Sequence, residues 1–130
     1  MNFAEILKAK IDKASEAAVQ RIADEIADAA ENYVPEDFIA VKDSISVKVD
    51  GYKTRGPERE EQWEDEEDQP RKKGEHSAEI YTDDDDGMAL EFGTHKTEAN
   101  PFLSRAFYEA LDSGEMHNII VEELKKEFKK

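Results

Sequence analysis

The stretch FAEILKAKIDKASEAAVQRIADEIADAAENY, residues 3–33, decides how the rest of this chain can fold. Its apolar residues recur at steps of three and four, which predicts a single amphipathic helix. The expected apolar stripe consists of Leu7, Ile11, Ala14, Ala18, Ile22, Ile26, Ala29 and Tyr33. Asn2 and Glu5 resemble a capping box at its start. Val34-Pro35 ends it, because the residue before a proline avoids helical geometry.

The length of this helix raises a packing problem. At 1.5 Å per residue it would be about 46 Å long, whereas a compact chain of this size has a radius of gyration of only about 14 Å. The helix therefore has to bend, break or pack against a neighbour. Its stripe is too rich in alanine for a strong coiled-coil seam, so we expect close packing on a sheet or on a second subunit.

Three downstream segments alternate apolar and polar residues, as half-buried β-strands do. In the first, Ile45, Val47 and Val49 alternate with Ser46 and Lys48, and Asp50-Gly51 offers a turn. Residues 77–82 and 87–93 form the other two, and the second of these places Met88, Leu90 and Phe92 on one face. The DDDDG turn between them predicts a β-hairpin. We therefore expect an antiparallel sheet of at least three strands.

Two helices are predicted to close the chain. Asn100 suits the N-cap of the first and Pro101 its first helical position, and Asp112-Ser113-Gly114 ends it. Its expected inner face consists of Leu103, Phe107, Ala110 and Leu111, with Phe102 and Ala106 beside it. The last helix is expected from Glu115 to about Lys129, with Met116, Ile120, Leu124 and Phe128 facing inward. The predicted fold class is α+β, in a single domain over residues 1–130.

Charge is the unusual feature of the composition. The chain has a net charge of −15, of which residues 57–70 carry −7 and Asp83–Asp86 carry −4. Low hydrophobicity and high charge predict a mobile acidic loop at about residues 53–75. Its acids include Glu60, Glu61, Glu64, Asp65, Glu66, Glu67 and Asp68. Such a surface argues against direct phosphate binding; it is either a solvated loop or a means of keeping DNA from adhering. Trp63 in this loop is either a packing anchor or a partner contact.

Composition also limits the class of protein. The chain has no cysteine, which excludes disulfides and thiolate metal sites. No apolar run approaches the roughly 18 residues that a membrane span needs, and the N-terminus does not resemble a secretory signal. We expect a soluble intracellular protein without a membrane partner.

A search for catalytic chemistry finds only weak patterns. The DDDDG turn lacks the ligand spacing of an EF-hand, and His76, His95 and His117 show no zinc-site spacing. Glu91 and Lys96 could suggest a nuclease-like carboxylate–lysine pair, but no aspartate completes it. There is no P-loop, GxSxG or GxGxxG motif. We therefore expect no enzyme activity, no metal and no cofactor.

The segment EFGTHKTEANPF has a defined structural pattern but no catalytic motif. Phe92 is expected to end a strand facing inward, Gly93 to allow a sharp departure, and a polar loop to lead into the capped helix. A loop held at both ends is a natural interface element. The predicted interface residues are Glu91, Phe92, Gly93, Thr94, Asn100, Pro101, Phe102 and Leu103.

This segment resembles the tail-completion (head–tail joining, or neck) proteins of long-tailed bacteriophages. The resemblance lies in Glu-Phe-Gly-Thr at 91–94, in Asn-Pro-Phe-Leu at 100–103 and in Ala106 and Phe107; VKDSISV at 41–47 resembles the segment before that family's first strand. Residues 57–74 depart from the family, which more often has a shorter or basic connection there.

The resemblance implies a non-catalytic α+β subunit of the virion, made in the bacterial cytoplasm and assembled at the junction of head and tail. It implies a homo-oligomeric ring of about six subunits, bound to other head-completion and tail proteins, through which DNA passes without specific binding. The long helix and residues 91–107 would build the contacts, and the acidic tract or Asp83–Asp86 would face the lumen or a rim. The resemblance does not separate a neck or completion protein from a tail-terminator protein, because the two have related folds.

Two other classes remain open at this point. An acidic regulator that mimics DNA would carry its carboxylates along one rigid face. A metal-dependent nuclease would cleave DNA in the presence of Mg²⁺.

Overall fold

The computed structural model describes residues 2–57 and 75–130. The long N-terminal helix is confirmed: α1 runs from Phe3 to Tyr33 without a break. The Asn2 side chain accepts a hydrogen bond from the Glu5 backbone N–H at 2.9 Å, and the Glu5 carboxylate accepts one from the Asn2 N–H at 3.3 Å, which completes the capping box. Val34 takes the extended conformation that Pro35 imposes, and α1 ends there.

The sheet has three short antiparallel strands in the order β2-β1-β3. They are β1 (Ser46–Val49), β2 (Tyr52–Arg55) and β3 (Ala78–Tyr81). Asp50 and Gly51 both have positive φ, as a two-residue hairpin turn between β1 and β2 requires. The start of the predicted acidic loop, from residue 53, is thus wrong, because β2 occupies residues 52–55.

The predicted hairpin over residues 77–93 is also wrong. Its first half is β3, but its second half is helix α3, from Asp85 to Phe92. Asp84 caps this helix by accepting the Asp86 N–H at 3.0 Å, and the acids of the first turn favour a helix N-terminus. The buried residues of α3 follow helical spacing, since Gly87, Leu90 and Glu91 face the core while Phe92 is exposed.

The remaining elements are a 3₁₀ turn (Glu36–Phe38) and the helices α2 (Ile39–Ser44), α4 (Phe102–Asp112) and α5 (Glu115–Phe128). Both C-terminal helices are confirmed, but α4 begins one residue later than predicted, and Asn100 does not cap it. The predicted inner faces are rotated. The buried positions are Phe102 and Ala106 in α4 and Ile119 and Glu123 in α5, whereas Phe107, Leu111, Ile120 and Phe128 are exposed.

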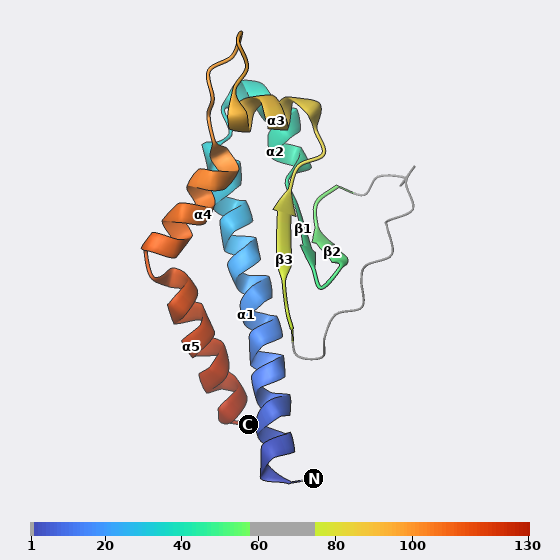
Figure 1. Ribbon diagram of the computed structural model, residues 1–130, viewed down its shortest axis with the longest axis vertical. Helices are drawn as coiled ribbons and strands as arrows, with labels where there is room; N and C mark the ends of the chain where they lie inside the picture. Colours follow the sequence, from blue (N-terminus) through green and yellow to red (C-terminus); the bar gives the residue numbers. More distant parts are fainter. Residues whose placement is uncertain (1, 58–74) are drawn as a thin grey trace.

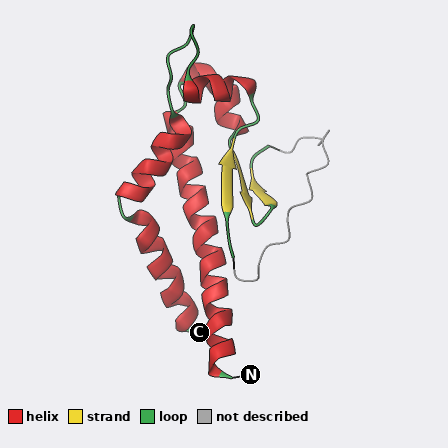
Figure 2. Cartoon of the chain, in the orientation of Figure 1, coloured by secondary structure: helices red, strands yellow, loops and turns green. Residues whose placement is uncertain are grey.

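Helix α1 is the central layer of the molecule (Figure 1). One side packs on β1 and β3, and another packs on α4 and α5. Small residues let the backbone approach closely: Ala23, Ala27 and Ala30 have almost no exposed surface. Helices α2 and α3 lie at the end of the molecule where α1 stops, and both chain termini lie at the opposite end (Figure 2). The expectation that α1 packs closely on a sheet is therefore confirmed.

Candidate interaction surface

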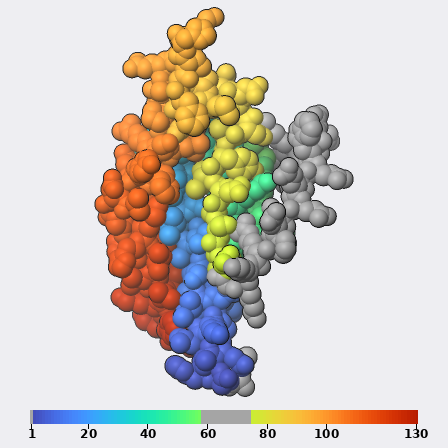
Figure 3. Space-filling view, viewed as in Figure 1, coloured from blue at the N-terminus to red at the C-terminus, as the bar shows by residue number. Residues whose placement is uncertain are grey.

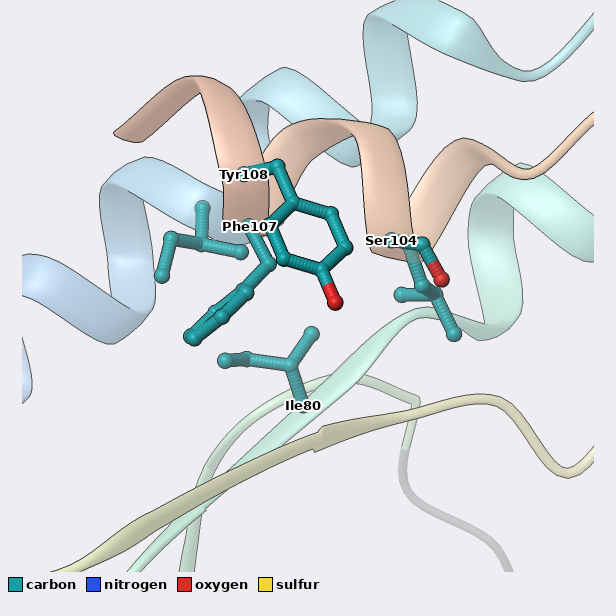
Figure 4. A pocket seen from close by; sticks show the side chains of 6 residues that line it. Ile80, Ser104, Phe107 and Tyr108 are labelled. Carbon is teal, nitrogen blue, oxygen red and sulfur yellow. The ribbon is translucent and has the colours of Figure 1, made fainter. Parts of the chain in front are cut away.

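Two shallow hollows lie along α1. The first has a volume of about 250 Å³ and is lined by Ile26, Ile80, Leu103, Ser104, Phe107 and Tyr108 (Figure 4). The second has a volume of about 270 Å³ and is lined by Ile11, Ala14, Ser15, Ala18, Val19, Ile22, Ile120 and Leu124. Among the described residues that line either hollow, none is charged.

The two hollows share one side of α1. Ile11, Ser15, Ile22 and Ile26 follow one another at intervals of four, seven and four residues, which places them on the same helix face. The walls come from α4 and α5 on one side and from β3 at the upper hollow; in Figure 3 the blue atoms of α1 lie between these elements. We call this surface the α1 furrow. Over the 15 residues from Ile11 to Ile26 it would extend about 22 Å.

Aromatic side chains form the wall of the furrow at α4. The rings of Phe107 and Tyr108 meet edge to face with centroids 5.5 Å apart, and both project toward Ile80 of β3 (Figure 4). Leu111, one turn beyond Phe107, is also exposed. Aromatic rings at a partly exposed apolar surface are typical of protein–protein contacts. The sequence pattern had assigned Phe107 and Leu111 to the core, so it missed them as surface residues.

Glu91, one of the predicted interface residues, bonds to the start of α4. It is only 7% exposed, and its two carboxylate oxygens accept the backbone N–H groups of Leu103 at 2.9 Å and Ser104 at 3.0 Å. The Ser104 hydroxyl donates a further bond to it. Glu91 thereby satisfies the free N–H groups at the start of α4, the role that the sequence pattern gave to Asn100.

The loop between α3 and α4 is built around Gly93 and Asn100. Gly93 has φ 76° and ψ 166°, a conformation that only glycine adopts readily, and a Cβ there would lie 2.9 Å from the backbone nitrogen of Ala99. The Asn100 N–H donates to the Leu90 carbonyl at 2.7 Å, which closes the loop at its base. Thr94 accepts the N–H groups of Lys96 and Thr97 through its hydroxyl.

The predicted interface segment therefore separates into two groups. Phe102 is fully buried in the core and Leu103 is half-buried; together with Glu91 and the loop base they position α4. Phe92, Thr94 and Pro101 are exposed and available for contacts. The prediction that Phe92 faces inward at a strand end is wrong, since it lies on the outer face of α3 with 75% of its surface exposed.

His76 ties α1 to the sheet. Its Nδ1 lies 2.7 Å from Asp50 Oδ2 in the β1–β2 turn, and its Nε2 lies 2.8 Å from Asp12 Oδ1 of α1. The hydrogen bond with Asp50 is the main cause that raises the pKa of His76, which burial opposes and the Asp12 carboxylate supports. The two carboxylates therefore favour the protonated imidazole, which can donate a hydrogen bond to each of them.

The other predicted chemical groups are dispersed. Within residues 2–57 and 75–130, no group of three His, Asp or Glu side chains could hold a metal ion. Of the DDDDG turn, Asp84 caps α3, and the predicted Glu91–Lys96 pair has its carboxylate occupied by α4. No described helix is both long and apolar enough to cross a membrane. The acidic residues Glu60, Glu61, Glu64, Asp65, Glu66, Glu67 and Asp68, and also Trp63, lie outside the described residues.

Comparison with known proteins gives no match: no family model, no curated protein and no solved structure is significantly similar to this chain.

Proposed function

We propose that this chain is a structural subunit of a bacteriophage head–tail junction, where it forms a ring and binds neighbouring head and tail proteins. The observation that carries the proposal is the α1 furrow. The chain leaves two uncharged hollows on one face of its central helix, over a stretch of about 22 Å from Ile11 to Ile26. Apolar surface of this kind, bordered by aromatic side chains, favours burial against another protein.

The local architecture supports the same proposal. The long N-terminal helix, the small antiparallel sheet and the two C-terminal helices agree with the α+β subunit that the resemblance implies, although the strand expected before Gly93 is helix α3. Glu91, Gly93 and Asn100 hold α4 in a fixed position relative to α3, so the aromatic wall of the furrow stands on a rigid base. Pre-positioned contact residues lower the entropy cost of association.

The negative charge of the chain fits the passage of DNA. A net charge of −15 repels the phosphate backbone, and the subunit has no need to grip a molecule that must move past it. In this proposal the protein contributes contacts and a repulsive surface, with no metal, no cofactor and no chemical step.

Deletion of the gene from the phage or inducible prophage that encodes it tests the proposal directly. The expected result is a lysate in which filled heads and finished tails accumulate separately, as seen by electron microscopy, and in which the wild-type gene supplied in trans restores joined particles. A lysate of normally joined, infectious particles would contradict the proposal.

A pair of variants then tests the role of the furrow. Phe107→Ser with Tyr108→Ser removes the aromatic groups of one wall at exposed positions, so folding should be retained while complementation fails. Tyr52→Ser is the control, because Tyr52 is an even more exposed aromatic residue and lies on β2, away from the furrow. The two rival classes have their own readouts: Mg²⁺-dependent cleavage of plasmid DNA by the pure protein, or tight binding to a nucleic-acid-binding protein with normal particle assembly.

A further inference from the structure

Each end of the molecule exposes large apolar side chains outside the α1 furrow. At the end where both termini lie, Phe3 is 77% exposed, and Ile6, one turn later on the same side of α1, is also exposed. At the opposite end, Met88 and Phe92 are 70% and 75% exposed and lie one turn apart on the outer face of α3. Ile39 of α2, at the same end of the molecule, is exposed as well.

The charges at these two ends have opposite sign. Residues 2–13 and 125–130, which we call the basic end, contain seven lysines and three acids, a net of +4. The acidic end, residues 36–43 and 83–98, contains nine acids and two lysines, a net of −7, or −6 without the buried Glu91. Hydrogen bonds from the Lys10 ammonium to the carbonyls of Glu127 and Lys130 hold the two segments of the basic end together.

We propose that the basic end of one copy binds the acidic end of a second copy of this chain. The apolar side chains supply the driving force on burial, and the opposite charges select this pairing over the two alternatives. Basic end against basic end and acidic end against acidic end would each bring like charges together, which disfavours them. Asp85 lies on the same face of α3 as Met88 and Phe92, so the charge and the apolar group would meet the partner together.

The overall negative charge does not prevent this contact under cellular conditions. The Debye length is about 8 Å at physiological ionic strength, which is much shorter than the roughly 46 Å that α1 spans. Each end therefore responds mainly to the charges that face it, rather than to the net charge of −15.

An end-to-end contact is heterologous, because the two partners use different surfaces. Repetition of such a contact closes into a ring when each copy is rotated by a fixed fraction of a turn. In this arrangement the α1 furrow stays free for a head or tail protein. Only this step, from paired ends to a ring at the junction, rests on the proposed function.

Because the chain has no cysteine, single cysteines can map the contact without interference. The full chain is made as Ile6→Cys, as Met88→Cys and as the control Tyr52→Cys, and equimolar pairs are oxidised at equal concentration. The proposal expects a disulfide-linked dimer in the Ile6→Cys and Met88→Cys mixture at a yield at least about tenfold above either variant alone and above either variant mixed with Tyr52→Cys. Equal yields in all mixtures, or dimers of one variant with itself, would overturn it.

Charge reversal gives an independent measure in the otherwise wild-type chain. Lys8→Glu with Lys13→Glu should weaken self-association, measured by sedimentation velocity across a concentration series, by at least about tenfold. Addition of Asp85→Lys and Asp86→Lys to the same chain should restore a large part of the lost self-association. Lys42→Glu with Lys96→Glu is the matched control: it changes the net charge equally but at the acidic end, and should not weaken association.

Equal weakening by both lysine pairs would show a response to net charge alone and would overturn the proposal, as would a protein that is monomeric at about 1 mM and physiological ionic strength. These results are separate from the deletion phenotype, since loss of head–tail joining with a monomeric protein would keep the proposed function and discard the end-to-end contact.

Discussion

Large apolar side chains occur both at the junction between α3 and α4 and in the first third of α1. They differ in exposure to solvent. At the junction Phe102 has no exposed surface, and the buried Glu91 carboxylate is fully engaged with α4. In the first third of α1, Phe3, Ile6 and Ile11 are exposed, although the helix itself is regular and capped. The same type of side chain therefore stabilises the monomer in one region and is left for a partner in the other.

This contrast means that stability and assembly can be tested separately. Substitutions at the α3–α4 junction should change the free energy of unfolding. Substitutions at the ends and at the exposed positions of the α1 furrow should change association and leave the free energy of unfolding nearly constant, because exposed sites away from special contacts usually contribute less than about 0.5 kcal/mol.

Two phenylalanines, ten residues apart, give the largest test of this contrast. Phe102→Ala should lower the free energy of unfolding by about 3–5 kcal/mol, because it removes a fully buried ring and leaves a cavity. Phe92→Ala, at an exposed position, should change it by less than about 0.5 kcal/mol. Urea unfolding of both variants checks the pair, and similar losses would erase the distinction between the two regions.

Glu91 should have the next largest effect. Glu91→Ala removes a charged cap from α4 and leaves the N–H groups of Leu103 and Ser104 without it, at a cost of about 2–3 kcal/mol. Glu98→Ala, in the exposed loop, serves as the control for loss of one carboxylate. Thermal unfolding at neutral pH measures both; a Glu91→Ala protein as stable as its control would show that the cap is dispensable.

Two glycines with positive φ sharpen the comparison within the C-terminal half. Gly93→Ala should destabilise by about 2 kcal/mol, since its backbone conformation suits only glycine and the added Cβ would meet Ala99. Gly114→Ala should cost only about 1 kcal/mol, because its left-handed conformation is strained for alanine but nothing lies within 4 Å of the new Cβ. The order of the two midpoints in urea is the observable, and a reversed order would refute the steric argument.

The smallest expected effect lies at the border between the open and covered parts of α1, where His76 holds Asp12 and Asp50. The bonded carboxylates raise the folded-state pKa of His76 above its usual 6.5, so the folded state binds the proton more tightly than the unfolded state. The resulting stability is fully present below about pH 6.5 and is lost as the pH rises through the raised pKa. His76→Gln should lower the free energy of unfolding by about 1 kcal/mol at pH 6 and should flatten this dependence.

Urea unfolding of the wild type and His76→Gln at several pH values between about 5.5 and 8.5 measures the difference between them. The free energies of unfolding of the wild type and His76→Gln, plotted against pH, should converge at the alkaline limit. Parallel curves would mean that His76 is not the group whose titration matters.

Local signals explain which parts of the fold could be predicted. The capping box at Asn2 and the proline after Val34 gave the exact limits of α1, because both act within a few residues. The Asp-Ser-Gly stop between α4 and α5 acts over a similarly short range. Helix α3 differs from the predicted strand because Met88, Leu90 and Phe92 alternate, and five residues of alternation also fit a helix that starts after a capping aspartate.

Long-range contacts explain what the sequence could not show. Strand β2 has no apolar alternation and exists because the Asp50-Gly51 turn brings it beside β1. The cap of α4 comes from Glu91, and Glu123 is buried because Arg21 of α1 reaches it at 2.8 Å. The furrow was missed for the same reason: which side of α4 and α5 faces α1 depends on the whole arrangement, and periodicity alone left both helices free to rotate.

Because α1 is covered unevenly, its backbone amides should also differ in their rates of hydrogen exchange. Its backbone amides near Ala23, Ala27 and Ala30 lie between the sheet and α4, so they should exchange with solvent deuterium only when the whole domain opens. The amides near Ile6 should exchange through fraying of the end, which is faster by orders of magnitude. One uninterrupted helix would thus contain both the slowest and some of the fastest amides of the protein, and a bound neighbour would register as a slowing confined to the fast end.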